Sequence, residues 1–213
     1  MEKNFWIQKW KKKEIAFHQS QVNPHLKLNF EKLNLKKGSR VFLPLCGKTL
    51  DIAWLLSQGY QVVGAELVET AIQELFAELE IKPQITHLGK FNHYAAQNID
   101  IFVGDIFELS KEVLGRVDAI YDRAALVALP KELREKYTKH LMDITNKAAQ
   151  LLVVYEYDQN KIQGPPFSLS ADEIKKHYEN EYHLILIDSV EVPGGGMKGQ
   201  VPAKENVWLL EKR

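Results

Sequence analysis

The sequence predicts an α/β fold in which a mainly parallel sheet carries helices on both faces. Apolar runs alternate with amphipathic helical segments along the middle of the chain, which is the pattern of consecutive βαβ units. The clearest unit is segment 40–67, with a buried strand, a turn containing one glycine, an amphipathic helix and a second buried strand. The second strand stops at Glu66, about 20 residues past the turn, where a carboxylate can accept hydrogen bonds from ribose hydroxyls.

Residues 1–35 precede this alternating region and are expected to be helical. Phe5, Trp6 and Trp10 have helical spacing and can share one face. Asn23 followed by Pro24 is typical of a helix start, because Asn caps the first turn and Pro suits its first position. A second helix is therefore expected to continue to about residue 33.

Five strands and three helices are expected in the region that follows. An irregular stretch at 85–96 also predicts a short hairpin, inserted before the third main strand. The strands are expected at residues 41–45, 61–65, 99–103, 119–121 and 151–155, and the helices at about 50–58, 69–80 and 131–147.

The C-terminal part changes from this alternation to a hairpin. Residues 163–167 are expected to form a loop, and Ser170 with Glu173 has the pattern of a helix capping box. Two strands follow at about 182–190 and 206–210, and the short glycine-rich connection between them predicts an antiparallel pair. Five parallel strands that end in such a hairpin make the seven-stranded, Rossmann-like sheet of the class I methyltransferases.

Length and composition are those of an ordinary globular chain, and we expect 1–213 to form a single domain. The 28 basic side chains balance the 28 acidic ones, so no net charge attracts nucleic acid. The single cysteine cannot form an internal disulfide, which suits a reducing compartment. Neither a signal-peptide pattern nor a run of about 18 apolar residues occurs. We therefore expect a cytoplasmic monomer without a nucleic-acid or membrane partner.

The turn at 44–47 argues against a cofactor that carries phosphates. A P-loop needs a glycine where Phe42 stands, and the dinucleotide fingerprint GxGxxG is absent because Gly47 is the only glycine of the turn. A pyrophosphate needs several backbone amides at close range. S-adenosylmethionine has ribose, adenine and an amino-acid tail but no phosphate, and it needs only a close backbone approach near Gly47. An ordinary strand-to-helix turn in an unrelated α/β protein is the alternative.

Ligands of a doubly wound sheet bind beyond the carboxyl ends of its strands, so the residues that follow each strand are the candidates. Arg123 follows a buried strand, and its planar donors suit the carboxylate of a cofactor or an anionic substrate. An ion pair with Asp122 is the alternative for Arg123, and a helix-capping role is the alternative for Asp105. The cofactor-binding candidates from these strand ends are Leu45, Gly47, Glu66, Asp105, Ile106 and Arg123.

Several motifs together carry a resemblance to a known family. The chain resembles the thiopurine S-methyltransferase family, most closely its bacterial members, over essentially its whole length. PLCGK followed by YDRAA is the specific combination. The matching stretches are FW at 5–6 with KW at 9–10, AFHQ at 16–19, residues 41–51 with PLCGK, GAEL at 64–67, GDIF at 104–107, YDRAA at 121–125 with ALP at 128–130, and GPPFS at 164–168.

This resemblance implies transfer of a methyl group from S-adenosylmethionine to the sulfur of a small aromatic or heterocyclic thiol. Bacterial members are also associated with selenium and tellurium compounds. Trp10 matches a further cofactor-contacting position, Phe17 matches an aromatic position that borders cofactor and substrate, and residues 1–35 are expected to form a lid over the cleft. Phe167 is expected to wall the substrate pocket, and Lys198 is the only basic residue that suits a substrate contact in the C-terminal hairpin region.

Methyl transfer from a sulfonium is an in-line displacement, so the protein mainly aligns the reactants and excludes water. A thiol is partly ionised near neutral pH, and we expect no dedicated general base and no metal. Arg123 is the expected orienting residue. His18, the only histidine near the lid, could relay a proton, but a core-facing or capping role is favoured for it. The alternatives are an O- or N-methyltransferase that depends on such a base, and a non-catalytic module that binds S-adenosylmethionine.

Overall fold

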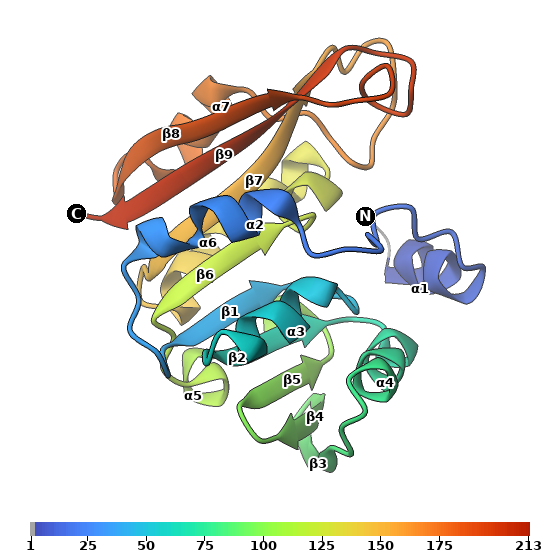
Figure 1. The fold of residues 1–213 in the computed structure, drawn as a ribbon, viewed down its shortest axis with the longest axis vertical. Helices are drawn as coiled ribbons and strands as arrows, with labels where there is room; N and C mark the ends of the chain where they lie inside the picture. Colours follow the sequence, from blue (N-terminus) through green and yellow to red (C-terminus); the bar gives the residue numbers. More distant parts are fainter. Residues whose placement is uncertain (1–2) are drawn as a thin grey trace.

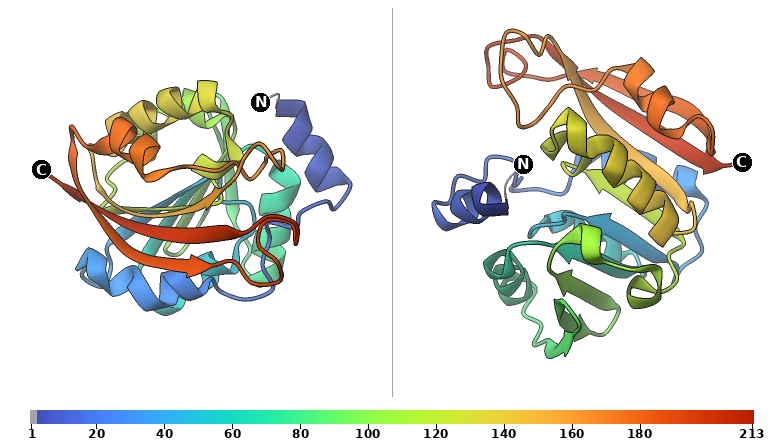
Figure 2. Two further views of the ribbon diagram at one scale, coloured as in Figure 1. Left: turned by 90° about the horizontal axis from the view of Figure 1, so that it is seen from above. Right: turned by 180° about the vertical axis from the view of Figure 1, so that it is seen from behind.

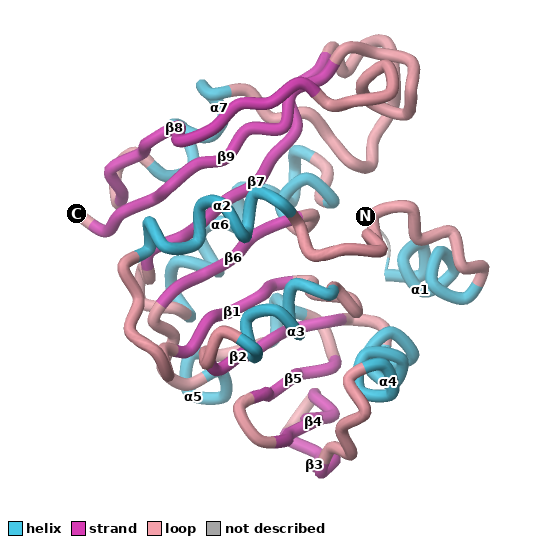
Figure 3. Tube along the Cα trace, viewed as in Figure 1, coloured by secondary structure: helices cyan, strands magenta, loops and turns pink. Residues whose placement is uncertain are grey.

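The computed structural model describes residues 3–213, which form a single nine-stranded sheet with helices on both sides (Figures 1 and 3). The strand order is β3-β4-β5-β2-β1-β6-β7-β9-β8. The strands are β1 (Arg40–Pro44), β2 (Gln61–Glu66), β3 (Gln84–Leu88), β4 (Phe91–Ala96), β5 (Ile99–Val103), β6 (Ala119–Arg123), β7 (Ala149–Tyr157), β8 (Tyr182–Glu191) and β9 (Ala203–Lys212).

Seven α-helices occur among the described residues. They are α1 (Lys3–Lys11), α2 (Pro24–Asn29), α3 (Leu50–Ser57), α4 (Glu69–Glu78), α5 (Lys111–Leu114), α6 (Lys131–Ile144) and α7 (Ala171–Tyr178). Three short 3₁₀ segments complete the set: η1 (Phe30–Leu33), η2 (Ile106–Glu108) and η3 (Leu126–Ala128).

The centre of the sheet is parallel and both of its edges are antiparallel hairpins. Strands β5, β2, β1, β6 and β7 run parallel, β7 pairs antiparallel with β9, and β9 pairs antiparallel with β8. The expected seven strands are therefore present. The hairpin predicted at 85–96 is also present, as β3 and β4, and it pairs with β5 in the same sheet. The expected number of seven strands is corrected to nine for this reason.

The two largest apolar clusters of the core lie one on each face of the sheet. Successive strand residues point to opposite faces, so Val62 lies in one cluster and Val63 in the other. Helices α2, α3 and α4 cover the face that contains Val62, with Leu26 and Leu55 among the buried contacts. Helices α6 and α7 cover the opposite face, seen on the other side of the sheet in Figure 2. Both faces of the parallel strands are thereby removed from water.

Side-chain caps begin several of the helices. The Asn23 side chain accepts hydrogen bonds from the first backbone amides of α2, and Thr49 does the same for α3. Ser170 caps α7 by accepting a hydrogen bond from the Glu173 amide, as predicted. The second half of the predicted capping box differs, because the Glu173 carboxylate lies 3.0 Å from the buried Arg134 guanidinium on α6.

Helix α1 lies beyond the carboxyl ends of the parallel strands, apart from the layers of the sheet (Figure 1). Trp10 is the buried residue of this helix, and it packs against Val68 and Ala71 near the start of α4. The segment from α1 to α2 therefore passes across the edge of the sheet where the strands end. Within residues 3–213, no helix is long and apolar enough to cross a membrane.

Candidate functional site

A cavity of about 750 Å³ opens at the carboxyl ends of β1, β2, β6 and β7. The ends of β1 and β2 line one half, the ends of β6 and β7 line the other half, and α1 with the segment after it covers both. Nine of the ten predicted site residues line it: Trp10, Phe17, Leu45, Gly47, Glu66, Asp105, Ile106, Arg123 and Lys198.

Glu66 lines the half of the cavity formed by the ends of β1 and β2. Its carboxylate is buried and accepts hydrogen bonds from the Gly47 amide at 2.8 Å and the Val68 amide at 2.9 Å. Burial raises the pKa of Glu66, and these backbone hydrogen bonds oppose the rise. The carboxylate thus ties the turn after β1 to the turn after β2.

The turn after β1 has an unusual backbone that explains its single glycine. Leu45 and Gly47 both have positive φ, at 48° and 52°, which lets the chain reverse tightly before α3. A Cβ atom at position 47 would lie 3.0 Å from the Trp10 ring. Only glycine lets α1 pack this closely on the turn.

Aromatic rings from the N-terminal segment form the roof over the turn. Trp10 and Trp6 each meet the Phe17 ring edge-on, with centroids 5.7 Å and 5.6 Å apart. Such edge-to-face pairs stabilise a cluster beyond simple burial. The three rings therefore hold α1 and the segment after it together as one unit above the cavity.

Asp105 lines the cavity and also caps the start of η2. Its side chain accepts a hydrogen bond from the Phe107 amide at the start of η2, which is the capping role considered as the alternative. The other carboxylate oxygen lies 2.9 Å from the Lys3 ammonium of α1. Ile106 follows with its side chain buried at the cavity wall. This region can offer a polar contact and an apolar surface side by side.

Arg123 points into the cavity rather than toward its neighbour Asp122. Its guanidinium donates to the Phe17 carbonyl at 3.3 Å, a contact that links β6 to the N-terminal segment. The Asp122 carboxylate is turned into the core, where it accepts hydrogen bonds from Leu126 N at 3.0 Å and the Tyr137 hydroxyl at 2.8 Å. The Asp122–Arg123 ion pair considered from the sequence is not among the contacts of residues 3–213. Burial raises the pKa of Asp122 to about 6.

The substrate-side prediction for Phe167 is not supported by its position. Phe167 is absent from the cavity lining, and its ring centroid lies 5.9 Å from the Arg134 guanidinium. The preceding Pro165 and Pro166 form the wall in its place. Lys198 does line the cavity, and its ammonium donates to the Gln163 carbonyl at 3.0 Å.

Several cavity residues were not singled out from the sequence. Asp51 is buried, accepts from the Asn23 amide at 2.8 Å and the Tyr121 hydroxyl at 3.2 Å, and so anchors the end of the N-terminal segment. Tyr155 and Met197 line the half above β6 and β7. No local motif marks these residues, since their neighbours come from distant parts of the chain. His18 also lines the cavity, and burial lowers its pKa, which favours the neutral ring.

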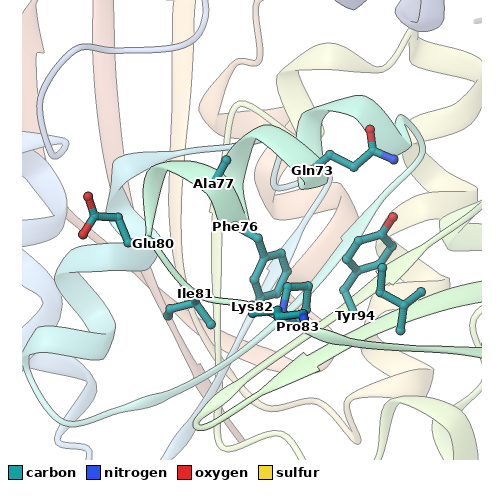
Figure 4. Close-up of a pocket in the computed structure, with 9 residues that line it drawn as sticks. Gln73, Phe76, Ala77, Glu80, Ile81, Lys82, Pro83 and Tyr94 are labelled. Carbon is teal, nitrogen blue, oxygen red and sulfur yellow. The ribbon is translucent and has the colours of Figure 1, made fainter.

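A second cavity of about 490 Å³ lies away from this site, beside the end of α4. Phe76, Ile81, Pro83 and Tyr94 are among its mostly apolar lining residues, and Figure 4 shows the Phe76 ring next to Pro83. The lining lacks the convergent polar groups of the first cavity, so chemistry belongs at the carboxyl ends of the parallel strands. Across residues 3–213, no cluster of His, Cys, Asp and Glu side chains is arranged to hold a metal ion.

A model of the family described as thiopurine S-methyltransferase (TPMT) matches residues 1–213. The chain belongs to this family. Curated relatives named thiopurine S-methyltransferase include one from Xanthobacter autotrophicus, 50% identical over 213 residues and covering 100% of both chains. Another, from Teredinibacter turnerae, is 50% identical over 212 residues, with 100% of this chain and 98% of the relative covered.

Solved structures with the same fold include a methyltransferase. A Burkholderia thailandensis 1,6-didemethyltoxoflavin-N1-methyltransferase with bound S-adenosylhomocysteine aligns over 99% of this chain and 87% of its own, with a TM-score of 0.67 and 14% identity. TehB from Haemophilus influenzae aligns over 96% and 66%, with a TM-score of 0.61 and 17% identity. At such low identity these structures establish the class I methyltransferase fold alone.

Membership of this family makes the chain an S-adenosylmethionine-dependent methyltransferase, and the residues present fit that cofactor. Each Glu66 oxygen accepts one hydrogen bond from Gly47 or Val68 and keeps a lone pair for a ribose hydroxyl. The volume of about 750 Å³ lies within the usual range for small-molecule sites.

Proposed function

We propose that the protein transfers the methyl group of S-adenosylmethionine to the sulfur of a small aromatic or heterocyclic thiol, such as a thiopurine. Family membership over residues 1–213 carries this proposal. The proposal extends to selenium and tellurium nucleophiles, because they ionise and attack carbon in the same way. It places the protein in the cytoplasm as a monomer, and the single buried cysteine suits that reducing compartment.

The two halves of the cavity suit the two ligands. Glu66 would hold the ribose, Ile106 with Asp105 would contact the adenine, and the Gly47 turn would allow the closest backbone approach. The acceptor would then occupy the half above β6 and β7, beside the wall of Pro165 and Pro166. Bound S-adenosylmethionine supplies a methyl group already activated on a sulfonium.

The chain's own residues would align the acceptor and keep water out. Arg123 stands between the two halves, where its guanidinium can hold the anionic form of a thiol or the carboxylate of the cofactor. Trp6, Trp10 and Phe17 would act as the lid, because their packed rings cover the cavity and can face a sulfonium. We propose this lid role for the N-terminal segment as a whole.

A methylation assay with a labelled donor tests the proposal. The panel contains 6-mercaptopurine, thiophenol, benzeneselenol, phenol and aniline, each at the same concentration. The proposed function predicts labelled product with the thiols and the selenol, and at least about 100-fold less with phenol and aniline. Preferred turnover of phenol or aniline would establish an O- or N-methyltransferase. Binding of S-adenosylhomocysteine without any labelled product would leave a non-catalytic binding module.

Arg123→Lys tests the orienting role within the same assay. Lysine keeps the positive charge but loses the planar fork that can grip an anion in two places. We expect kcat/KM for anionic thiols to fall by about 10- to 100-fold, which corresponds to the loss of one charged hydrogen bond. Unchanged kcat/KM for these thiols contradicts the role of Arg123. The control variant is Lys212→Arg, at the end of β9. Lys136→Arg would not be suitable, because Lys136 also lines the cavity.

A further inference from the structure

A pair of side chains behind the acceptor half of the cavity has no part in the function described so far. Tyr155, on β7, lines the cavity. Its partner across the β7–β9 ladder is Glu205, so the two side chains start side by side on the same face of the sheet. Arg123 lines the same cavity. Burial raises the pKa of Tyr155 to about 12, the negative charge of Glu205 adds to the rise, and the positive charge of Arg123 opposes it. Tyr155 thus stands between the cavity and a carboxylate.

The two oxygens of Glu205 have different surroundings. Oε2 lies 3.3 Å from Nε2 of His25 at the start of α2, and the other nitrogen of this ring lies 3.2 Å from Asp188 on β8. Oε1 is fully buried and accepts no hydrogen bond of normal geometry from residues 3–213. Glu205 therefore keeps unused acceptor capacity on the face of the sheet that it shares with Tyr155. A buried acceptor with unused capacity is uncommon and calls for a functional explanation.

The side chains of Tyr155, Glu205, His25 and Asp188 form a series whose two ends are placed to take up and release a proton. One end, Tyr155, lies in the half of the cavity where the acceptor thiol would bind, beside Arg123. The other end, Asp188, is partly exposed, with 32% of its side chain accessible to solvent. His25 between them is buried, and its raised pKa follows from its contact with Glu205 despite the opposing effect of burial.

We propose that Tyr155 and Glu205 form a proton path that removes the thiol proton during methyl transfer. The Tyr155 hydroxyl oxygen accepts the proton from sulfur while passing its own proton to the Glu205 carboxylate. The S–H electron pair stays on the acceptor sulfur, which forms the new bond to the methyl carbon as the bond from that carbon to the sulfonium breaks. The proton held on Glu205 leaves through His25 and Asp188 to solvent. Arg123 stabilises the negative charge that develops on the sulfur.

This inference rests on the proposed thiol methyltransferase function. It also predicts how the activity of variants depends on the acidity of the thiol. A thiol that is already ionised at the assay pH has no proton to lose, whereas a weakly acidic thiol depends on the path. The loss of activity in a variant that lacks the path should therefore grow with the pKa of the thiol. A merely structural role of Tyr155 or Glu205 would slow all thiols equally.

The test measures kcat/KM at pH 7 for 4-nitrothiophenol, thiophenol and benzyl mercaptan, in order of decreasing acidity. The variants are Tyr155→Phe and Glu205→Gln, with Tyr94→Phe and Glu211→Gln as matched substitutions away from the cavity. We expect both site variants to lose at least about tenfold on benzyl mercaptan and less than about twofold on 4-nitrothiophenol. The matched substitutions should leave all three values unchanged.

A spectroscopic measurement gives a second result that does not depend on turnover. With S-adenosylhomocysteine bound, the ultraviolet absorbance of the thiolate form of thiophenol is followed against pH. The wild-type protein should ionise bound thiophenol at a higher pH than Glu205→Gln does, because the negative charge of the Glu205 carboxylate near the sulfur opposes the charge of the thiolate. Affinity for S-adenosylhomocysteine, measured by calorimetry, should be the same in both proteins.

Three outcomes overturn the proton path. These are an equal loss on all three thiols, no loss on any of them, and a wild-type enzyme that accepts only thiols already ionised at pH 7. A wild-type enzyme that methylates no thiol at all, in the panel described above, refutes the proposed function itself. The two failures are therefore distinguishable.

Discussion

Glu66 is the residue on which cofactor binding should depend most. Its carboxylate is buried and already oriented by the Gly47 and Val68 amides, so we expect it to accept hydrogen bonds from a ribose without rearrangement. We expect Glu66→Ala to weaken S-adenosylhomocysteine binding by about 10- to 100-fold, the equivalent of lost hydrogen bonds to a charged group. Isothermal titration calorimetry measures the change.

A control separates this effect from general destabilisation. Glu211→Ala, at the exposed end of β9, should bind S-adenosylhomocysteine like the wild type. Equal affinity in Glu66→Ala and the wild type would show that the ribose lies elsewhere.

The buried Asp122 carboxyl should make the free energy of unfolding depend on pH. Burial raises its pKa from 3.8 to about 6, so between these values the folded protein binds a proton that the unfolded chain releases. The free energy of unfolding should therefore fall as pH rises from about 4 to about 6, and the contribution should stay constant at higher pH. The shift corresponds to on the order of 2–3 kcal/mol.

Asp122→Asn provides the reference, because its amide oxygen can still accept the hydrogen bond from Leu126 N. Urea denaturation of both proteins between pH 4 and pH 7 isolates the contribution of this one carboxyl. The stability of the wild type relative to Asp122→Asn should decline across that range. Parallel curves for the two proteins would show that Asp122 does not titrate there.

At the scale of elements, the contact between α1 and the turn after β1 controls how the cavity is covered. Gly47→Ala places a Cβ 3.0 Å from the Trp10 ring, at a positive φ of 52°. Gly38→Ala also has a positive φ, of 81°, but its Cβ would meet nothing within 4 Å. Both substitutions should therefore cost about 1–2 kcal/mol of stability through backbone strain.

Only Gly47→Ala should displace α1 in addition. We expect it to weaken S-adenosylhomocysteine binding by about tenfold or more and to speed tryptic cleavage in the basic stretch 9–13. Calorimetry and timed proteolysis followed by mass spectrometry measure the two effects. Similar behaviour of both alanine variants would mean that the contact with Trp10 has no role in binding.

The elements that local sequence determines were predicted well. The central strands agree with β1, β2, β5 and β6 to within about two residues, because their apolar runs are bounded by turn residues. Helix ends were less accurate: α6 ends at Ile144 rather than 147, where Asn146 and Lys147 turn the chain with positive φ. The four-residue helix α5 was missed, since it is too short to show a helical period.

The position of a residue at the cavity was predictable where that position follows from a strand end. Glu66 and Arg123 are such residues, and both line the cavity. Phe167 is not among the cavity-lining residues, because sequence does not show which way a loop side chain points, and its ring lies 5.9 Å from the Arg134 guanidinium. Tyr155 and Glu205 were missed, since only the β7–β9 register brings them together.

At the scale of the whole molecule, one continuous sheet separates two apolar clusters, and we expect both clusters to unfold in one cooperative transition. Leu55 lies in the cluster under α3 and Leu141 in the cluster under α6, both almost fully buried. Replacement of either by alanine should lower the free energy of unfolding by about 2–5 kcal/mol through lost burial and a cavity. Leu28→Ala, at a side chain that is 72% exposed, should change it by less than about 0.5 kcal/mol.

Circular dichroism and tryptophan fluorescence should report a single, coincident urea transition for each of these variants. The shared strands couple the two faces, so neither cluster can melt while the other stays folded. Separate midpoints from the two probes would contradict this coupling.

The position of Lys3 has a practical consequence for anyone who produces the protein. Its ammonium sits against Asp105 at the cavity mouth, whereas Arg213 follows β9 at the opposite end of the sheet (Figure 1). An affinity tag fused ahead of Lys3 would emerge beside the entrance and compete with the ligands for space. Purification handles and fluorescent labels therefore belong after Arg213.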